Sequence, residues 1–584
     1  MEKWVIRAGR ADYRALAEEF GVDPLLVRLM ANRGAATSAE IKKYLHATLA
    51  NLYDAALLKD GAAAAGLLLE TIGTGGIVIA SDFDVDGIFA GSLLQEVLSA
   101  LGARVRTLTP HRVLEGYGLN RRIVDDAVSL GASVILTCDN GIAAFDAIDY
   151  AVSLGLKVIV TDHHDIARDE EGRPRLPAAS AIVNPKQEDC PYPFKKLCGA
   201  AVAYKVAELL CRRAGRGFEA LEACIPYVAI ATVADVMDLE DENRIFVRIG
   251  LRMLSETKHI GLRAILDCCL PNEKTITAYH IGFVIGPCFN AAGRLETVSD
   301  ALALLRAANP ETAMALAEKL KSLNIERKAL TKAGYEEAVA VVERDGLDRD
   351  DVLVVHLPDC HESLAGIIAG RLRERYGKPC FVITGAGEVC KGSGRSIEAY
   401  HMYRALHECR ELLLRFGGHP MAAGLSLERN KINLLKNQLN ANSHLTDDDF
   451  CAIVKIDAAM PPEYATQELV TQLALLEPCG KGNARALFAG SRFRIRHAQV
   501  LGRERKVLRF EMIGEHGTPC QAIYFGDVEL FAKDLRDAYG EDAWARLLAD
   551  RAPEISMAFT YYPDINEYRG RCTLQFVIQN YRCL

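Results

Sequence analysis

Acidic side chains recur at short spacing in the first half of the chain, and they could hold divalent cations. Residues 81–87 read Ser-Asp-Phe-Asp-Val-Asp-Gly, which places three carboxylates within five residues. Further along the chain come Asp139 in Cys-Asp-Asn-Gly, residues 161–165 with the order Thr-Asp-His-His-Asp, and Asp235 in Ala-Asp-Val-Met-Asp. Like charges this close repel one another, so a fold tolerates them best around a bound cation.

Carboxylates combined with one or two imidazoles suit Mg²⁺ or Mn²⁺ better than a structural zinc. Two such ions about 3.5–4 Å apart are a recurring arrangement for phosphoester hydrolysis, in which one ion holds the attacking water. An EF-hand is a poor alternative, because a helix rather than a twelve-residue loop follows the first motif. For any single Asp the alternative is a helix N-cap after a strand. Helix capping alone is a poor explanation for four acidic motifs that each follow a predicted strand of one sheet.

The elements that must position these residues are predicted strand–helix units between residues 72 and 165. The predicted strands are 76–80, 132–137 and 157–161, and the predicted helices are one ending at Leu101 and one over 144–154. Strands rich in Val and Ile that are joined by helices predict a parallel sheet covered on both faces. Ligands bind such sheets beyond the carboxyl ends of the strands. We interpret the apolar run 227–233, before the fourth acidic element, as another such strand.

The second half of the chain has a different pattern of apolar residues. Residues 311–343 carry apolar side chains at three- and four-residue spacing, which predicts a helix about 50 Å long. Further strands are predicted at 351–356 and 379–384. Beyond about residue 450, alternating segments predict a small β-barrel or sandwich, with strands at 492–496, 507–512 and 522–525.

Composition sets limits on the class of protein. The chain has 584 residues, of which 50% are hydrophobic and 25% are charged, so it is neither disordered nor fibrous. Its net charge of −8 argues weakly against a nucleic-acid substrate. Residues 485–509 nevertheless contain eight basic residues against one acidic residue, Glu504, interleaved with Phe488, Phe493 and Phe510. Basic groups beside aromatic platforms are typical of single-strand binding, and the alternative is a solvated charged face.

The cysteines and the N-terminus bear on the compartment. The 17 cysteines are scattered without a Cys-x-x-Cys pair, which favours reduced thiols. The sequence has no secretory signal and no long apolar segment, so we expect a cytoplasmic protein without membrane association.

Read together, these motifs make the chain resemble the DHH phosphoesterase superfamily. The four signatures are DFDVDG, CDNG, the Asp-His-His of TDHHD, and ADVMDL. Five further segments are similar to the RecJ family of single-stranded-DNA exonucleases: HRVLEGYGLN at 111–120, LCGAAVAYK at 197–205, NAAGRL at 290–295, KGSGRS at 391–396 and FGGHPMAAG at 416–424. The resemblance extends over nearly the whole chain.

The resemblance implies an α/β fold with a parallel-sheet DHH catalytic domain, a long connecting helix, a smaller α/β DHHA1 domain and a C-terminal OB-fold barrel. The expected segments are an N-terminal helical segment at 1–70, the DHH domain at 71–305, the connecting helix at 306–345, the DHHA1 domain at 346–448 and the OB-fold at 449–584.

The resemblance also assigns roles to residues. The implied ligands of two cations, Mn²⁺ or Mg²⁺, are Asp82, Asp84, Asp86, Asp139, His163 and Asp235. The expected catalytic residues are Asp139, as a bridging carboxylate, and His163 and His164, with His164 orienting the phosphate or protonating the leaving oxygen. Asp162 is expected to hold an imidazole. The substrate-binding candidates are Arg112, Asn290, Arg294, Lys391, Ser393, Arg395, Gly417, Gly418 and His419.

The expected activity is metal-dependent hydrolysis of single-stranded DNA from its 5′ end, releasing 5′-mononucleotides in DNA repair and recombination. The polarity rests on the resemblance alone. Single-strand-binding protein and a RecQ-type helicase are candidate partners, and we expect a monomer. Two alternatives are a phosphodiesterase acting on short oligoribonucleotides or cyclic dinucleotides, and a non-catalytic DNA-binding replication scaffold. The chain departs from the family pattern at Cys288, Cys479 and Ser363, which bears on DNA binding more than on chemistry.

Overall fold

The computed structural model describes residues 2–112, 114–169, 171–502, 505–549, 555–568 and 570–584. The chain forms two compact units. One consists of residues 52–452, and the other combines residues 1–51 with residues 453–584. No described helix is both long and apolar enough to cross a membrane.

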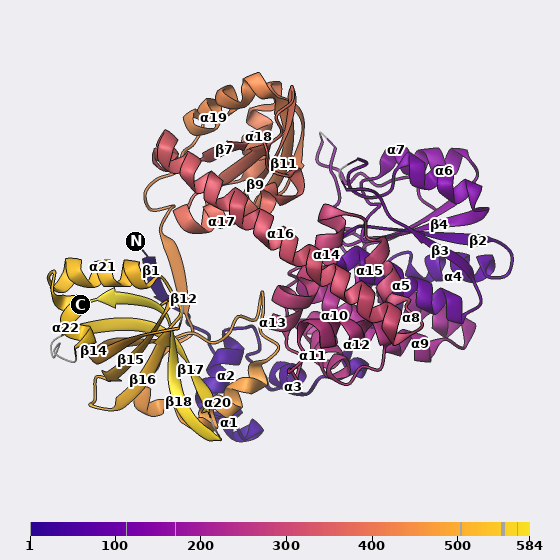
Figure 1. Cartoon of the computed structure of the whole chain (residues 1–584). Coiled ribbons are helices and arrows are strands. Elements are labelled where there is room, and N and C mark those ends of the chain that lie inside the picture. Colours follow the sequence, from indigo (N-terminus) through magenta and orange to yellow (C-terminus); the bar gives the residue numbers. More distant parts are fainter. Residues whose placement is uncertain (1, 113, 170, 503–504, 550–554, 569) are drawn as a thin grey trace. The chain divides into compact units, whose positions relative to one another are not determined.

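A five-stranded parallel sheet organises the first part of the larger unit (Figure 1). Its strand order is β3-β2-β4-β5-β6. The strands are β2 (Gly76–Ser81), β3 (Arg104–Leu108), β4 (Ala132–Cys138), β5 (Lys157–Thr161) and β6 (Ala181–Val183). The three predicted strands are confirmed as β2, β4 and β5, which lie side by side in this order. Every residue of β2 is buried, as expected for a central strand covered on both faces.

Helices connect these strands and complete the domain. They are α4 (Gly61–Thr71), α5 (Val85–Ala100), α6 (Arg121–Ser129), α7 (Phe145–Ser153), α8 (Gly199–Ala214), α9 (Phe218–Ala223), α10 (Ile225–Ala234), α11 (Asp241–Ser255), α12 (Ile260–Cys269), α13 (Ala278–His280), α14 (Gly286–Leu295) and α15 (Ser299–Leu305). A π-helical turn, Ile281–Ile285, joins α13 to α14.

The strand interpreted at 227–233 is wrong, because this segment lies inside helix α10. Eight of the ten residues of α10 are buried, so its sequence is apolar all round and shows no helical stripe. Hydrophobic periodicity cannot separate such a buried helix from a buried strand. The fourth acidic element therefore follows a helix.

The predicted long helix is confirmed as α16 (Pro310–Asp345), which has 36 residues. It leads into a second, five-stranded sheet of order β10-β11-β9-β8-β7. The strands are β7 (Leu353–Leu357), β8 (Cys380–Thr384), β9 (Val389–Arg395), β10 (Leu413–Gly418) and β11 (Ala422–Glu428), and the helices are α17 (Ala365–Tyr376), α18 (Met402–Glu408) and α19 (Ile432–Ala441). The predicted strands near 351–356 and 379–384 correspond to β7 and β8.

The second unit is a β-barrel with helices from both ends of the chain. Its sheet has the order β13-β14-β15-β16-β18-β17, and pairing of β14 with β17 closes it. The strands are β13 (Ala458–Ala459), β14 (Phe488–Leu501), β15 (Val507–Ile513), β16 (Pro519–Tyr524), β17 (Ser556–Tyr568) and β18 (Arg571–Cys583), with a separate pair of β1 (Glu2–Ile6) and β12 (Ala452–Ile456). The helices are α1 (Tyr13–Phe20), α2 (Pro24–Ala31), α3 (Ser38–His46), α20 (Gln467–Leu473), α21 (Val528–Tyr539) and α22 (Ala543–Leu548).

One hydrophobic core unites the N-terminal helices with the barrel. Leu26, Leu29 and Met30 of α2 belong to the same buried cluster as Phe488 and Phe510. Arg33 adds an ion pair to Asp457, with Nη1 3.2 Å from Oδ1. Figure 1 accordingly shows the indigo α1 and α2 beside the yellow strands.

The interpretation of Phe488, Phe493 and Phe510 as stacking platforms is wrong, because these rings are at most 1% exposed inside the barrel. On β14 side chains alternate between the two faces, so the rings point inward while Arg494 and Arg496 are exposed. The basic stretch is therefore a solvent-facing surface without those three rings. Its members Arg503 and Glu504 lie outside the described residues.

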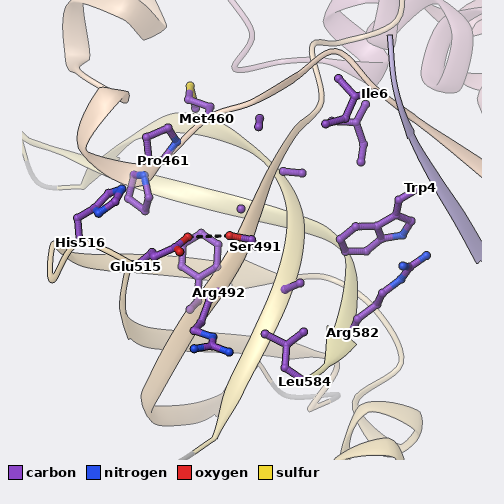
Figure 2. A pocket seen from close by; sticks show the side chains of 17 residues that line it. Trp4, Ile6, Met460, Pro461, Ser491, Arg492, Glu515, His516, Arg582 and Leu584 are labelled. Carbon is purple, nitrogen blue, oxygen red and sulfur yellow. Dashed lines mark hydrogen bonds between the residues drawn. The ribbon is translucent and has the colours of Figure 1, made fainter.

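A pocket of about 550 Å³ lies in the barrel unit (Figure 2). Arg492 of the basic stretch lines it together with Trp4 and Arg582, whose guanidinium lies 4.4 Å from the centre of the Trp4 ring. Ser491 donates a hydrogen bond of 2.7 Å to Glu515 at the same pocket.

Candidate metal centre

Three strand ends bring the acidic motifs to one edge of the parallel sheet. Residues 82–86 follow β2, Asp139 follows β4, and residues 162–165 follow β5. Because β2, β4 and β5 are parallel neighbours, their carboxyl ends meet. Asp235 joins them as the residue that ends α10.

The His163 imidazole lies at the centre of this cluster. Its Nε2 is 3.1 Å from Oδ1 of Asp139, and 3.7 Å from Oδ2 of both Asp86 and Asp235. Asp82 and Asp84 have ligand atoms within 4.8 Å of Asp139. The structure therefore brings together all six residues predicted as metal ligands.

These residues form overlapping groups that could each hold an ion. One group is Asp82, Asp84 and Asp139, another is Asp86, His163 and Asp235, and a third is Asp139, His163 and His164. Asp139 belongs to the first and third groups, and His163 to the second and third. These groups would suit two divalent cations, with Asp139 offering two carboxylate oxygens and the neutral His163 one nitrogen.

The carboxylates of the cluster are poorly compensated by protein groups. Among the described residues, no hydrogen bond of normal geometry reaches either oxygen of Asp82 or Oδ1 of Asp139, although Nε2 of the neutral His163 lies 3.1 Å from the latter. Both residues are at most 1% exposed. Burial and then the charge of Asp84 raise the pKa of Asp82, and burial and then the charge of Asp86 raise the pKa of Asp139. Buried, orphaned oxygens of this kind fit divalent cations, which would supply the missing positive charge.

Asp86 is oriented by the start of helix α8. The backbone amides of Gly199 and Ala200 donate to its two oxygens at 2.6 and 2.7 Å. Burial and then the charge of Asp84 still raise the pKa of Asp86 to about 7. Gly199 also allows a close approach, because a Cβ there would lie 2.6 Å from Cβ of Asp139.

The two histidines have opposite electrostatic environments. Burial and then the charge of His164 lower the pKa of His163 to about 3, so its ring is neutral and able to ligate a metal. Burial also disfavours a charged His164, but a 2.8 Å hydrogen bond with Asp162 outweighs it and raises the pKa of His164 to about 9. His164 is therefore protonated at neutral pH.

Asp162 acts behind the histidines. Its Oδ2 accepts a 2.9 Å bond from the amide of Ile142, and its Oδ1 accepts from the amide of His163 at 2.7 Å. Burial opposes its ionisation, but the bond with His164 and the charge of that ring prevail and lower the pKa of Asp162. This geometry agrees with the expectation that Asp162 holds an imidazole.

Tyr117 contacts the site, although no role was predicted for it from the sequence. Its hydroxyl donates a 2.5 Å bond to the carbonyl of Asp139 and lies 3.1 Å from Nδ1 of His164. Its position in the Glu-Gly-Tyr-Gly turn was the only sequence signal.

Three of the predicted substrate-binding arginines form one cationic group. Arg112 lies 4.7 Å over the ring of Phe83, Arg294 donates a 2.6 Å bond to the carbonyl of Ser363, and Arg395 closes the group. Burial and then the charge of Arg112 lower the pKa of Arg294 to about 9. Mutually repelling guanidinium groups favour an anion between them, as a phosphate would be.

The other predicted substrate-binding residues lie on β9, on and directly after β10, and on α14. Lys391 is paired with Glu362 at 2.9 Å, and it alternates with Ser393 and Arg395 along β9, as predicted. Gly417 and Gly418 end β10, and Nδ1 of the following His419 lies 3.6 Å from Oδ2 of Asp165. Asn290 lies half-buried on α14. The roles of all these residues stay predictions.

The parallel sheet, its acidic edge and the second α/β domain define a phosphoesterase of the DHH class. Sequence profiles agree: the DHH family N-terminal domain matches residues 76–232, the DHHA1 domain matches 349–443, and the RecJ OB domain matches 456–580. The chain belongs to the RecJ family, as its similarity to curated members establishes.

Two of these relatives carry the name single-stranded-DNA-specific exonuclease RecJ. The Escherichia coli protein is 34% identical over 95% of this chain and 95% of its own length. The Bacillus subtilis protein is 35% identical over 82% of this chain, which spans only 60% of that longer protein.

Solved structures agree with the sequence relatives. The crystal structure of RecJ from Thermus thermophilus in complex with Mn²⁺ matches with a TM-score of 0.82 and 25% identity, over 99% of this chain and 79% of that one. A structure of exonuclease RecJ bound to manganese matches with a TM-score of 0.59 and 30% identity, over 69% of this chain and 97% of that one.

Proposed function

We propose that this protein is a metal-dependent exonuclease that hydrolyses single-stranded DNA from the 5′ end and releases 5′-mononucleotides. The observation that carries the proposal is the set of buried, orphaned carboxylate oxygens around His163 at the edge of the parallel sheet. The curated relatives are named single-stranded-DNA-specific exonucleases, and solved RecJ structures contain Mn²⁺ or Mg²⁺. The 5′ polarity rests on family resemblance.

Two divalent cations, Mn²⁺ or Mg²⁺, would be held by the six predicted ligands, namely Asp82, Asp84, Asp86, Asp139, His163 and Asp235. When bound, they would activate the attacking water and stabilise charge on the phosphoryl oxygens. Asp139 fits the role of a bridging carboxylate, because it belongs both to the group with Asp82 and Asp84 and to the group with His163 and His164.

The protein's own groups orient the substrate and supply a proton. Against the effect of burial, the hydrogen bond with Asp162 raises the pKa of His164 and holds its ring in the metal-free site, so His164 is proposed to donate to the scissile phosphate or to the 3′ oxygen as the P–O bond breaks. Arg112, Arg294 and Arg395 are proposed to bind the phosphate chain, and the amides of Gly417 and Gly418 with His419 to contact it from the second sheet. Lys391, Ser393 and Asn290 are proposed as further contacts.

The barrel unit offers a further surface for DNA. Its outward-facing Arg492, Arg494 and Arg496 lie along one strand, which suits electrostatic binding of a phosphate backbone. A long single strand is therefore a better substrate for this chain than a cyclic dinucleotide. Single-strand-binding protein, a RecQ-type helicase, the monomeric state and a cytoplasmic location stay predictions. The segments 71–305, 306–345, 346–448 and 449–584 are proposed as functional domains, and 1–70 as an N-terminal segment whose first 51 residues belong to the barrel unit.

The test uses single strands labelled at the 5′ or the 3′ end, with and without Mn²⁺. We expect metal-dependent release of labelled mononucleotide from the 5′-labelled strand at the earliest times. Digestion from the 3′ end would refute the polarity. Faster hydrolysis of a dinucleotide than of a long strand would favour the small-substrate phosphodiesterase, and binding without any cleavage would favour the scaffold.

A further inference from the structure

Two thiols far apart in sequence touch beside the proposed DNA-binding helix. Cys269 ends α12, and Cys288 lies in the first turn of α14, the helix that carries Asn290 and Arg294. Their sulfur atoms are 3.9 Å apart. A disulfide needs a separation of about 2.05 Å, so side-chain rotation has to close about 2 Å.

We propose that Cys269 and Cys288 form a reversible disulfide that weakens binding of the DNA by α14, an inference whose functional part rests on the proposed nuclease activity. The oxidant is a hydroperoxide such as hydrogen peroxide. One sulfur of the pair attacks one oxygen of hydrogen peroxide, which gives a sulfenic acid and, with the thiol proton, water. The other sulfur then attacks the sulfenic sulfur, the S–S bond forms, and the oxygen leaves as water with the second thiol proton. Overall, two thiols lose two hydrogens and the peroxide becomes two waters.

The surroundings suit this chemistry. Cys288 is 1% exposed, whereas Cys269 is partly exposed and opens the pair to a small oxidant. The contact with Cys269 lowers the pKa of Cys288 against the effect of burial, and the Asn324 amide and the charge of Lys328 lower it further, while the Cys288 thiol donates a 3.2 Å hydrogen bond to the carbonyl of Val284. Cys380, which is completely buried, shows the contrast, because burial raises its pKa.

A short chain of polar contacts connects Cys288 to the cationic group. Nδ2 of Asn324 on α16 donates to the Cys288 sulfur at 3.4 Å. Oδ1 of Asn324 in turn accepts from the Arg327 guanidinium, at 2.9 Å from Nη2 and 3.2 Å from Nε. The charge of Arg327 acts on Arg294. When Cys288 turns towards Cys269, the Asn324 amide loses its sulfur partner. Asn324 then no longer holds the Arg327 guanidinium in place, and the charge of Arg327 next to Arg294 shifts.

The pairing is a property of this chain's own residues and needs no metal.

The chemical test exposes the full-length reduced protein to hydrogen peroxide and maps the peptides after blocking free thiols. We expect a Cys269–Cys288 cross-linked peptide that dithiothreitol removes. Cys269→Ser should abolish it, whereas the matched control Cys268→Ser, at the neighbouring position, should keep it. Cross-linking through Cys268 instead, or no cross-link at all, would overturn the proposal. Cys269→Ser changes a partly exposed side chain, so it keeps the test valid if Cys288→Ala does not fold.

The functional test compares reduced and oxidised protein on a long single strand. We expect the KM to rise roughly threefold or more on oxidation, with little change in kcat and with recovery after reduction. An unchanged KM in fully cross-linked protein would overturn the switch. Failure of the nuclease proposal would look different, because the reduced wild-type protein would then cleave no DNA while the cross-link still formed.

Discussion

Two sets of buried charges in the larger unit differ in how they are compensated. Lys205 and Glu242 are completely buried and lie 2.9 Å apart. The carbonyl of Tyr53 accepts from Lys205, and the hydroxyl of Tyr192 and the amide of Tyr53 donate to Glu242, at 2.5–2.7 Å. The cluster around His163 instead leaves Asp82 and Asp139 with orphaned oxygens. In the first set, protein groups therefore satisfy both charges.

This contrast separates structural from functional buried charges. A satisfied ion pair connects elements of the fold, here the segment at Tyr53 with helices α8 and α11. An unsatisfied group of like charges costs folding free energy, and a protein retains it where a ligand offsets that cost. Substitutions in the two sets should therefore act on different measurable quantities.

The largest effect on activity is expected for Asp139→Asn. Asp139 has φ = 60°, a left-handed conformation that Asn tolerates better than Ala, so Asn removes the charge with little backbone strain. We expect the cleavage rate to fall by about 10³-fold or more, because a proposed bridging ligand is lost. The thermal stability of the metal-free variant should be equal to or higher than that of the wild type, as repulsion is relieved. Cleavage at the wild-type rate would contradict the metal assignment.

Lys205→Met should have the opposite profile. It leaves Glu242 buried without its cation, which should lower the free energy of unfolding by about 3–5 kcal/mol in a denaturant titration. The nuclease rate per folded molecule should be unchanged below the unfolding transition. A double variant, Lys205→Met with Glu242→Leu, is the control and should recover part of the loss. A stable single variant with a large loss of rate would contradict the division between the two sets.

The pH dependence of metal binding should report on the unsatisfied set. Burial raises the folded pKa of Asp86 to about 7, above an unfolded value near about 3.9. The metal-free fold therefore gains stability as pH falls below about 7, whereas Mn²⁺ must displace the proton. The apparent Mn²⁺ affinity, measured by calorimetry, should weaken about tenfold per pH unit for each displaced proton below about pH 7. An affinity that is flat from about pH 8 to about pH 6 would show that the carboxylates are already ionised.

The smallest effect is expected for Tyr117→Phe. The change removes the hydroxyl that contacts both the Asp139 carbonyl and His164, while the ring keeps its edge contact with Phe83. We expect roughly a tenfold fall in kcat, since groups that orient metal-site residues typically contribute about 10–100-fold. Stability should change little. The pH–rate profile provides the check, because a shifted limb would reveal a changed His164.

Much of the architecture could be predicted because strong patterns mark it. Val- and Ile-rich runs with acidic residues after them located β2, β4 and β5, and Pro310 and Gly346 marked the two ends of α16. The neighbouring order of the strands then follows from parallel pairing. The convergence of Asp82, Asp84, Asp86, Asp139 and His163 was predictable for this reason, whereas Asp235 follows helix α10 rather than a strand.

Other features have no local signature in the sequence. The run 227–233 is apolar on all sides, so its helical state depends on what surrounds it. The inward direction of Phe493 depends on the register of β14 in a closed barrel. The amides of Gly199 and Ala200 that hold Asp86 are backbone groups, which nearly any residue type supplies. Such contacts are visible only in three dimensions.

The shared core of the barrel unit has a consequence for synthesis of the protein. Helices α1 to α3 are translated before the barrel, and the partners of Leu26 and Met30 in the buried core, including Phe488 and Phe510, follow more than four hundred residues later. Helices α1 to α3 therefore lack the partners of their apolar side chains while residues 52–452 are translated. Residues 52–452 form a compact unit of their own. A release of the chain before the barrel is complete would leave residues 52–452 able to fold while helices α1 to α3 lack the core that buries their apolar side chains.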